Sequence, residues 1–234
     1  MALGYNKPLF LLPFDHRSTF AKNLFGLTGN IKKEQKDLIR VYKEIIYDAF
    51  KLAVTSGVPI ENSAILVDEE YGEQILIDAG KKGITTCLTV EKSGQDEFDF
   101  EYGEKFGLHI KKINPNFVKA LVRYNPLGDT RLNMRQRKKL KILSLFCKKE
   151  GYKFLLEPLV PNNVKDFKLV GDISKGSFDK EVRPQLTLRM IREMQEYGVE
   201  PDVWKIEGMW DKSDYEKVVA VARNSTSRKD VGVI

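Results

Sequence analysis

The stretch LFLLPFDHR, residues 9–17, decides between two α/β folds. Its apolar run, Leu9–Phe14, is typical of a buried strand, and Asp15, His16 and Arg17 follow directly. An open sheet that binds a dinucleotide carries a glycine-rich turn after its first strand. No GxGxxG and no GxxxxGK[ST] pattern occurs anywhere in the chain. Polar residues at this point instead favour a barrel, whose functional groups gather where the strands end.

The rest of the chain repeats the alternation of strand and helix. Six further runs predict strands, at Ala64–Val67, Ile84–Val90, Val118–Tyr124, Phe154–Leu156, Val203–Ile206 and Val231–Ile234. Helical periodicity lies between them, at 34–55, 71–82, 131–150, 184–197 and 212–224, and more weakly at 96–107. This order predicts parallel strands with helices packed outside, an α/β fold of the (β/α)8 TIM-barrel type.

The strand count is seven, whereas a complete barrel of this type has eight strands. We therefore expect one barrel domain over residues 1–234 that is truncated at its seventh strand, with the C-terminal strand or strands missing. A natural, open arrangement of seven strands is the alternative.

Composition points to a globular protein of a reducing compartment. The chain has 42% hydrophobic and 31% charged residues, and its two cysteines, Cys87 and Cys147, give neither a disulfide framework nor a zinc pattern. The N-terminus has no basic region followed by a long apolar run, so we expect no signal peptide. No stretch approaches the roughly 18 apolar residues that a membrane helix needs. We expect a cytoplasmic protein without a membrane partner.

The net charge of +6 is concentrated in one run, RQRKKLK at 135–141. The apolar residues in and after it place the run on an amphipathic helix whose basic side faces water. No aromatic residues interleave with the basic ones, so a solvated face is favoured over a nucleic-acid surface. A positive field also suits an anionic small-molecule substrate.

Lys205 is the most informative candidate residue. It lies in DVWKIEG (202–208), where strand alternation puts Val203, Lys205 and Glu207 on one face. A buried ammonium is costly unless it is paired or put to use. Burial and nearby cations favour the neutral amine, which can attack a carbonyl and form a Schiff base. A plain ion pair with Glu157 or Glu207 is an equal alternative.

Other charged residues also stand at predicted strand ends. Glu157 could move protons beside the lysine, or serve only as its ion-pair partner. Arg123, and Lys119 four residues before it, could act on the amine or hold an anion, although Lys119 could instead lie at the opposite end of the strands. Arg183 closes a long segment, 161–183, that is either a lid reaching an anionic substrate or a surface insertion.

Acidic residues follow three of the strands. Asp15, Asp68 and Glu91 could orient substrate hydroxyls, although an acidic residue at a loop start is also a common helix N-cap, above all at Asp68. The chain has only two histidines, His16 and His109, which are far apart in sequence. This favours a Schiff-base route over a metal site, and we expect no metal and no cofactor.

Six segments together resemble the class I tagatose-bisphosphate aldolase family and the related sulfofructosephosphate aldolases. They are FDHR (14–17), ILVDEEYG (65–72), VEKSG (90–94), VKALVRYNPLG (118–128), FLLEPLV (154–160) and DVWKIEG (202–208). PDVWKIEG (201–208) and KEVRPQLTLRMIREMQEYG (180–198) look closer still to the aldolase-like C-terminal domain of 5-dehydro-2-deoxygluconokinase, of inositol catabolism.

This resemblance implies an aldolase-type barrel and roles for the matched residues. Lys205 would form the Schiff base, Glu157 would act as acid and base, and Lys119 would lie near the amine. Asp15 and Arg17 would line the mouth. The implied reaction cleaves 6-phospho-5-dehydro-2-deoxygluconate into dihydroxyacetone phosphate and malonate semialdehyde. The family's last two strands supply phosphate contacts, and this chain stops before them.

Three classes of function therefore compete. A class I aldolase with a phosphorylated substrate comes first, with homo-oligomerisation left open. A non-catalytic sugar-phosphate-binding or regulatory domain, derived from a fusion with a carbohydrate kinase, is the alternative. A nucleic-acid-binding protein, resting on the basic run alone, comes last.

Overall fold

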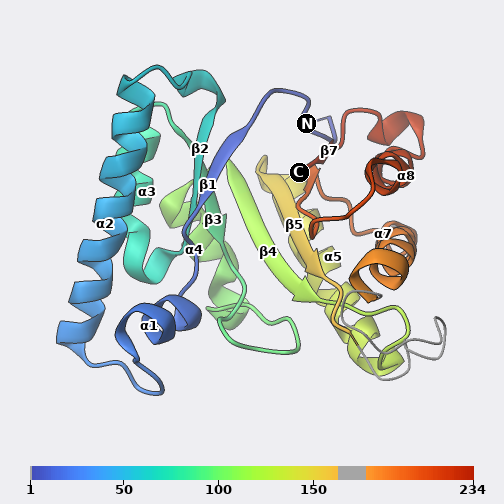
Figure 1. Ribbon diagram of the computed structural model, residues 1–234, viewed down its shortest axis with the longest axis horizontal. Helices are drawn as coiled ribbons and strands as arrows, with labels where there is room; N and C mark the ends of the chain where they lie inside the picture. Colours follow the sequence, from blue (N-terminus) through green and yellow to red (C-terminus); the bar gives the residue numbers. More distant parts are fainter. Residues whose placement is uncertain (1, 163–177) are drawn as a thin grey trace. The chain divides into compact units, whose positions relative to one another are not determined.

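The computed structural model describes residues 2–162 and 178–234, and within them it contains seven strands (Figure 1). These are β1 (Phe10–Pro13), β2 (Ser63–Val67), β3 (Thr85–Thr89), β4 (Phe117–Arg123), β5 (Lys153–Leu159), β6 (Val203–Trp204) and β7 (Gly232–Val233). They belong to one sheet, whose strand order from β1 to β7 follows the chain. All the registered pairs are parallel, as predicted from the alternation of strands and helices.

The helices fall between the strands. They are α1 (Ser18–Phe25), α2 (Lys33–Thr55), α3 (Glu69–Lys81), α4 (Phe106–Ile113), α5 (Thr130–Glu150), α7 (Arg183–Tyr197) and α8 (Lys212–Ala222). Short helical turns occupy η1 (Ile60–Asn62), η2 (Gly103–Lys105), η4 (Phe178–Val182) and η5 (Thr226–Arg228). Five helices match the predicted ranges to within about two residues. The weak segment 96–107 was placed wrongly, because Gly103 begins the turn η2 and the helix begins only at Phe106. Helix α1 was not predicted.

The chain forms two compact units, which are described separately. The first-half unit contains residues 7–95 and 100–119, with β1, β2, β3 and the start of β4. Its strand β2 is buried along all five residues, as expected of a parallel strand covered on both faces. Helices α2 and α3 pack together beside these strands (Figure 1).

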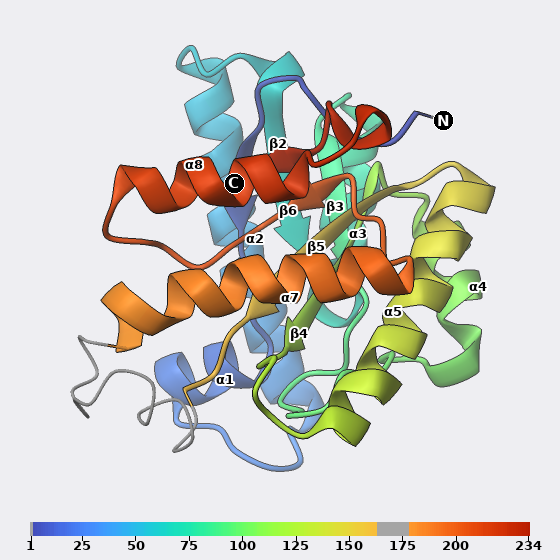
Figure 2. The same cartoon turned by 90° about the vertical axis from the view of Figure 1, so that its right-hand side faces the viewer.

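The second-half unit contains residues 2–6, 96–99, 120–162 and 178–234. Helices α7 and α8 run side by side over β5 and β6 (Figure 2). Gly4 comes so close to the backbone of Asp230 that a Cβ atom there would lie 2.3 Å from its carbonyl. Only glycine permits this approach, which leads into the hydrogen bond from the Tyr5 amide to the Asp230 carbonyl.

Helix ends follow the local chemistry of the sequence. Asp129 caps α5 by accepting hydrogen bonds from the amides of Arg131 and Leu132, at 2.7 and 3.1 Å. Gly151 and Gly198 end α5 and α7 in the left-handed conformation, as expected of C-terminal caps. No helix among residues 2–162 and 178–234 has both the length and the apolar character to span a bilayer.

Candidate functional site

Lys205 and Glu157 lie opposite each other on adjacent strands of the second-half unit. The register of β5 and β6 pairs Leu155 with Val203 and Leu156 with Trp204, so the next pair is Glu157 with Lys205. The Lys205 amide donates to the carbonyl of Leu156, which continues the ladder by one step at 2.9 Å. The Lys205 ammonium contacts the Glu157 carboxylate directly. A parallel register thus brings together two residues that are 48 positions apart in the chain.

The Lys205–Glu157 pair is partly buried but still accessible to solvent. The Lys205 side chain is 26% exposed and that of Glu157 is 14% exposed. Trp204, next to the lysine, is buried and turns to the other side of the strand. The amine is therefore partly buried beside a carboxylate and still accessible from solvent. Of the two ion-pair partners considered from the sequence, the structure selects Glu157.

Glu207 has a different task. Its carboxylate accepts a hydrogen bond from the amide of Val160, at 2.7 Å, where the chain leaves β5. The Arg183 guanidinium approaches the same carboxylate at 3.5 Å and also pairs with Asp179. Arg183 begins α7, and residues 163–177 of the predicted lid lie outside the described part of the chain. Arg183 therefore contacts Glu207, which lies two residues after Lys205 in the chain. Its guanidinium is already paired with the carboxylates of Glu207 and Asp179.

A second cluster, in the first-half unit, centres on Lys119. Its ammonium binds the carboxylates of Asp15, at 2.8 Å, and Glu91, at 2.9 Å. All three residues are at least nine-tenths buried. The register between β3 and β4 aligns Lys119 with Thr89, the last residue of β3, which explains why a residue early in β4 reaches the ends of β1 and β3. The interpretation that placed Lys119 at the opposite end of the strands was therefore wrong.

Arg17 extends this cluster. Its guanidinium donates to the carbonyl of Glu91 and binds the carboxylate of Glu101, the latter at 2.7 Å. The side chain is 7% exposed, and its Nε atom has no hydrogen-bond partner among the described residues. A buried donor without a partner is costly and is commonly satisfied by a ligand or water.

Asp68 has two structural roles. It caps α3 by accepting a hydrogen bond from the amide of Tyr71, at 2.9 Å, as one interpretation of the sequence predicted. It also pairs with Lys43, a residue of α2 that the sequence analysis missed. Burial lowers the pKa of Lys43 and raises that of Asp68, while their mutual attraction opposes both shifts. The periodicity of α2 offered a signal, because Ile39, Lys43 and Tyr47 recur on its buried side.

Three further residues were considered from the sequence, namely Arg123, His16 and His109. Arg123 is the last residue of β4 and is half-buried, and its carbonyl accepts a hydrogen bond from Gln136. His16 is exposed, whereas His109 pairs with Glu69. No group of His, Cys, Asp and Glu within the described ranges has the arrangement of a metal site.

The basic run on α5 is largely neutralised by its neighbours. Arg135 forms two hydrogen bonds with Glu97, at 2.7 and 2.9 Å, and Lys139 pairs with Asp99 at 3.0 Å. Arg137 lies 4.0 Å from Glu193. A phosphate-binding surface would present these cations uncommitted. The pairs favour the interpretation of the run as a solvated helix face.

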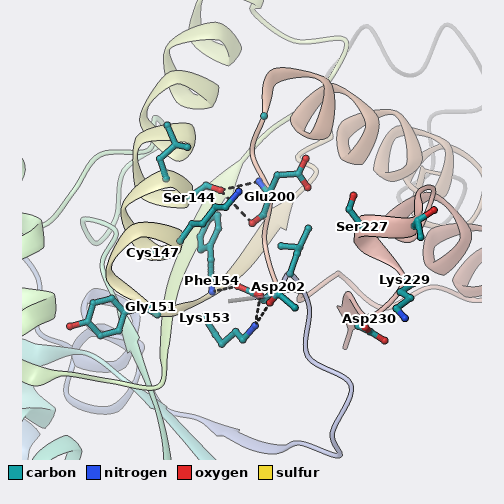
Figure 3. Close-up of a pocket in the computed structure, with 17 residues that line it drawn as sticks. Ser144, Cys147, Gly151, Lys153, Phe154, Glu200, Asp202, Ser227, Lys229 and Asp230 are labelled. Carbon is teal, nitrogen blue, oxygen red and sulfur yellow. Dashed lines mark hydrogen bonds and ion pairs between the residues drawn. The ribbon is translucent and has the colours of Figure 1, made fainter.

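The second-half unit also has a cavity of about 550 Å³ at the amino ends of β5 and β6 (Figure 3). Lys153 and Asp202 pair in its wall at 2.8 Å, and Asp202 also accepts from the amide of Phe154. Glu200 is held by Arg228. Lys153 and Glu157 are four residues apart on β5, so the cavity and the Lys205 pair lie roughly 13 Å apart along the strand. The cavity is thus separate from the candidate site.

The chain belongs to the family described as "Uncharacterized protein conserved in bacteria (DUF2090)", whose model matches residues 4–233. No curated protein matches it. Among solved structures, it is similar to a Schiff-base-forming fructose-1,6-bisphosphate aldolase and to an archaeal one whose catalytic lysine is bound to a carbinolamine. Each comparison has a TM-score of 0.57 at 13% identity and covers 98% of this chain and 74% of the other.

A further archaeal fructose 1,6-bisphosphate aldolase has a TM-score of 0.54 at 11% identity, over 97% of this chain and 84% of its own. At such identities the likeness establishes the fold. The protein is therefore an α/β protein of the aldolase barrel type, with seven parallel strands in the described residues.

Proposed function

We propose that this protein is a class I aldolase that uses Lys205 to form a Schiff base with a phosphorylated keto-sugar or keto-sugar acid. The contact between the Lys205 amine and the Glu157 carboxylate, at the carboxyl ends of β5 and β6, carries the proposal. Functional groups of parallel barrels gather at these strand ends. The fold shared with Schiff-base aldolases supports the same reaction class.

The ion pair is also the starting point for the chemistry. Proton transfer from the ammonium to Glu157 frees the amine to attack the substrate ketone. Loss of water from the carbinolamine gives an iminium, which accepts the electron pair of the breaking carbon–carbon bond. Glu157 takes the proton from the hydroxyl that becomes the aldehyde, and later returns a proton to the enamine carbon. Hydrolysis then releases the ketone and restores Lys205.

The particular substrate rests on the family resemblance of the sequence. We propose 6-phospho-5-dehydro-2-deoxygluconate, which the same steps cleave to dihydroxyacetone phosphate and malonate semialdehyde. The substrate carries a carboxylate and a phosphate. The mildly positive chain suits such an anion. Roles for Lys119, Asp15, Glu91, Asp68, Arg123 and Arg183 toward this substrate remain predictions.

Trapping with borohydride tests the proposal. Incubation with dihydroxyacetone phosphate and borohydride should leave a reduced adduct on the peptide that contains Lys205, because borohydride converts an iminium into a stable amine. Lys205→Met should abolish the adduct while the fold is retained, since methionine fills most of the same volume. Lys217→Met, which alters an exposed lysine paired with Asp214, is the matched control and should label normally.

The outcomes separate the alternatives. An adduct on another lysine would contradict the assignment of Lys205. No adduct with dihydroxyacetone phosphate, together with saturable binding of this compound, would instead support the non-catalytic sugar-phosphate-binding domain. Adduct formation without cleavage of 6-phospho-5-dehydro-2-deoxygluconate would overturn only the substrate.

A further inference from the structure

The cavity at the amino ends of β5 and β6 has walls that hydrogen bonds within the second-half unit hold in place. Lys153 donates to the carbonyls of Ala2 and Gly4, each at 2.8 Å, so the N-terminal segment is tied to the start of β5. Asp202 accepts hydrogen bonds from the amides of Gly4 and Phe154, also at 2.8 Å. A ligand would therefore enter a formed space and would not have to order these segments first.

The size and the lining of the cavity suit a small organic molecule. Its volume of about 550 Å³ lies within the range of roughly 300–1,000 Å³ that is typical of ligand pockets. Apolar side chains form part of the lining, namely Leu3, Leu145, Tyr152 and Phe154. Leu145 is 55% exposed, so its side chain is free to pack against the apolar body of a ligand.

Most of the charged groups in the lining are already paired with one another or with a neighbour. Lys153 pairs with Asp202 at 2.8 Å. The two carboxylate oxygens of Glu200 accept hydrogen bonds from the Arg228 guanidinium, at 2.5 and 2.9 Å. These pairs stabilise the wall and offer no net charge to a ligand.

Two lysines in the lining are not committed in this way. Lys148 lies in the last turn of α5 and Lys229 follows η5, and both are exposed. Neither ammonium has a hydrogen-bond or ion-pair partner among residues 2–162 and 178–234. Lys148 also offsets the negative end of α5, so Lys229 is the better placed of the two to bind a ligand directly.

One acidic group in the lining is nearly uncommitted as well. The carboxylate of Asp230 approaches the amide of Asn6 at 3.5 Å. Figure 3 shows Lys229 and Asp230 across the cavity from Phe154. The uncommitted charges are therefore two cations and one carboxylate, so the field in the cavity favours a negatively charged ligand.

We propose that this cavity binds a small organic anion. Its apolar body packs against Leu145 and Tyr152, and its carboxylate or phosphate group binds the ammonium of Lys229 through charge-assisted hydrogen bonds. Lys148 adds to the attraction from the end of α5. The proposal is independent of the proposed function, because Lys205 and Glu157 lie at the opposite ends of the same two strands.

Three probes that share one apolar body test the class of ligand. They are 1-naphthyl phosphate, 1-naphthoate and the neutral 1-naphthol. Isothermal titration calorimetry of the full chain should show saturable binding of at least one anion, roughly 10-fold or more tighter than binding of 1-naphthol. The tighter of the two anions identifies the preferred head group. Equal affinity for 1-naphthol, or no saturable binding of either anion, would overturn the proposal.

Matched variants test the place of binding. Lys229→Glu should weaken the bound anion by roughly 10-fold or more and leave 1-naphthol unchanged, because it reverses the charge beside the anionic group. Lys212→Glu makes the same change in net charge at a side chain that is 91% exposed and lies outside the lining, and it should not alter binding. Leu145→Ser should weaken all three probes alike, since it removes apolar contact.

Lys205→Met separates this site from the proposed catalytic one. It should bind the anion as the wild type does, because the cavity contains no part of the Lys205 pair. Circular dichroism of each variant checks that the fold is retained. Loss of binding in Lys205→Met would place the anion at the other ends of the strands and overturn the proposal. Equal effects of Lys229→Glu and Lys212→Glu would also overturn it, because the response would then follow net charge alone.

Discussion

The ammonium of Lys43 and the carboxylate of Asp68 contact each other with side chains that are 0% and 1% exposed. The lysine comes from the buried side of α2, and the aspartate caps α3 directly after β2. The rings of Phe20 and Tyr71 lie 5.8 and 5.5 Å from the ammonium. Removing one member of such a pair leaves an uncompensated charge in an apolar place.

Lys43→Met should therefore destabilise the protein by roughly 3–5 kcal/mol at neutral pH. Lys43→Met combined with Asp68→Asn should recover part of the loss, because the charge left behind is removed while a side-chain acceptor for the Tyr71 amide is kept. Urea unfolding of the two variants measures both effects. A double variant less stable than Lys43→Met would contradict this explanation.

The same variant should have a distinctive pH dependence. Burial already raises the pKa of Asp68, and loss of Lys43 removes the attraction that opposes this shift. A raised pKa means that folded Asp68 holds a proton which the unfolded chain has released. The contribution of Asp68 to the free energy of unfolding is therefore fully present below the pKa that Asp68 has in the unfolded chain. It is lost as the pH rises through the pKa that Asp68 has in the folded protein. The destabilisation by Lys43→Met should be smaller in mildly acidic buffer than at pH 7, as urea unfolding at each pH would show.

Two glycines of α3 should respond in opposite directions to alanine. A Cβ atom at Gly72 would lie 2.4 Å from Cγ2 of Val67, which is itself fully buried in β2. Gly72→Ala should cost roughly 1–3 kcal/mol through overpacking. Gly80→Ala, in the same helix, has nothing within 4 Å and should stabilise the protein by about 0.5–1 kcal/mol through its higher helix propensity. If Gly72→Ala and Gly80→Ala shift the thermal unfolding temperature equally, the close approach of residue 72 to Val67 has no effect on stability.

The fold could be predicted from the sequence because its signals are local. Runs of apolar residues predict all seven described strands, and helical periodicity predicts α2, α3, α5, α7 and α8. Helix α1, with eight residues, is too short for its period to stand out. Helix α4 was displaced because the glycines at 103 and 107 obscure where the helix begins.

The candidate site was predicted only in part. From the sequence, Glu207 on the same strand face and Glu157 at the end of the preceding strand were equal candidates for the partner of Lys205, and the parallel register of β5 and β6 selects Glu157. That register depends on tertiary packing, and no local pattern in the sequence encodes it. Lys43 was missed because a lysine in a helix is normally assigned to the solvent side, and only the joint burial with Asp68 reveals it.

Lys119 should be essential to the stability of the first-half unit. Lys119→Met removes the cation between the carboxylates of Asp15 and Glu91 and leaves two buried negative charges facing each other. The expected loss is roughly 3–5 kcal/mol. Lys119→Met with Asp15→Asn and Glu91→Gln should be more stable than the single variant, as chemical denaturation would measure. If Lys119→Met unfolds at the same denaturant concentration as the wild type, the ammonium of Lys119 is not needed to balance the charges of Asp15 and Glu91.

Glu157→Gln should separate formation of the Schiff base from turnover. The variant keeps the shape of the side chain and loses the group that accepts and returns protons beside Lys205. An adduct should still be trapped with dihydroxyacetone phosphate and borohydride because Lys205 is intact, although it should form more slowly without the carboxylate that accepts the proton of the ammonium. Cleavage should slow by roughly 10²- to 10⁴-fold if Glu157 is the acid–base group. Glu207→Gln is the comparison variant. Its carboxylate binds the Val160 amide and not the amine, so its effect on cleavage should be much smaller. If the two variants are slowed equally, the contact between Lys205 and Glu157 is only an ion pair, and the acid–base role lies elsewhere.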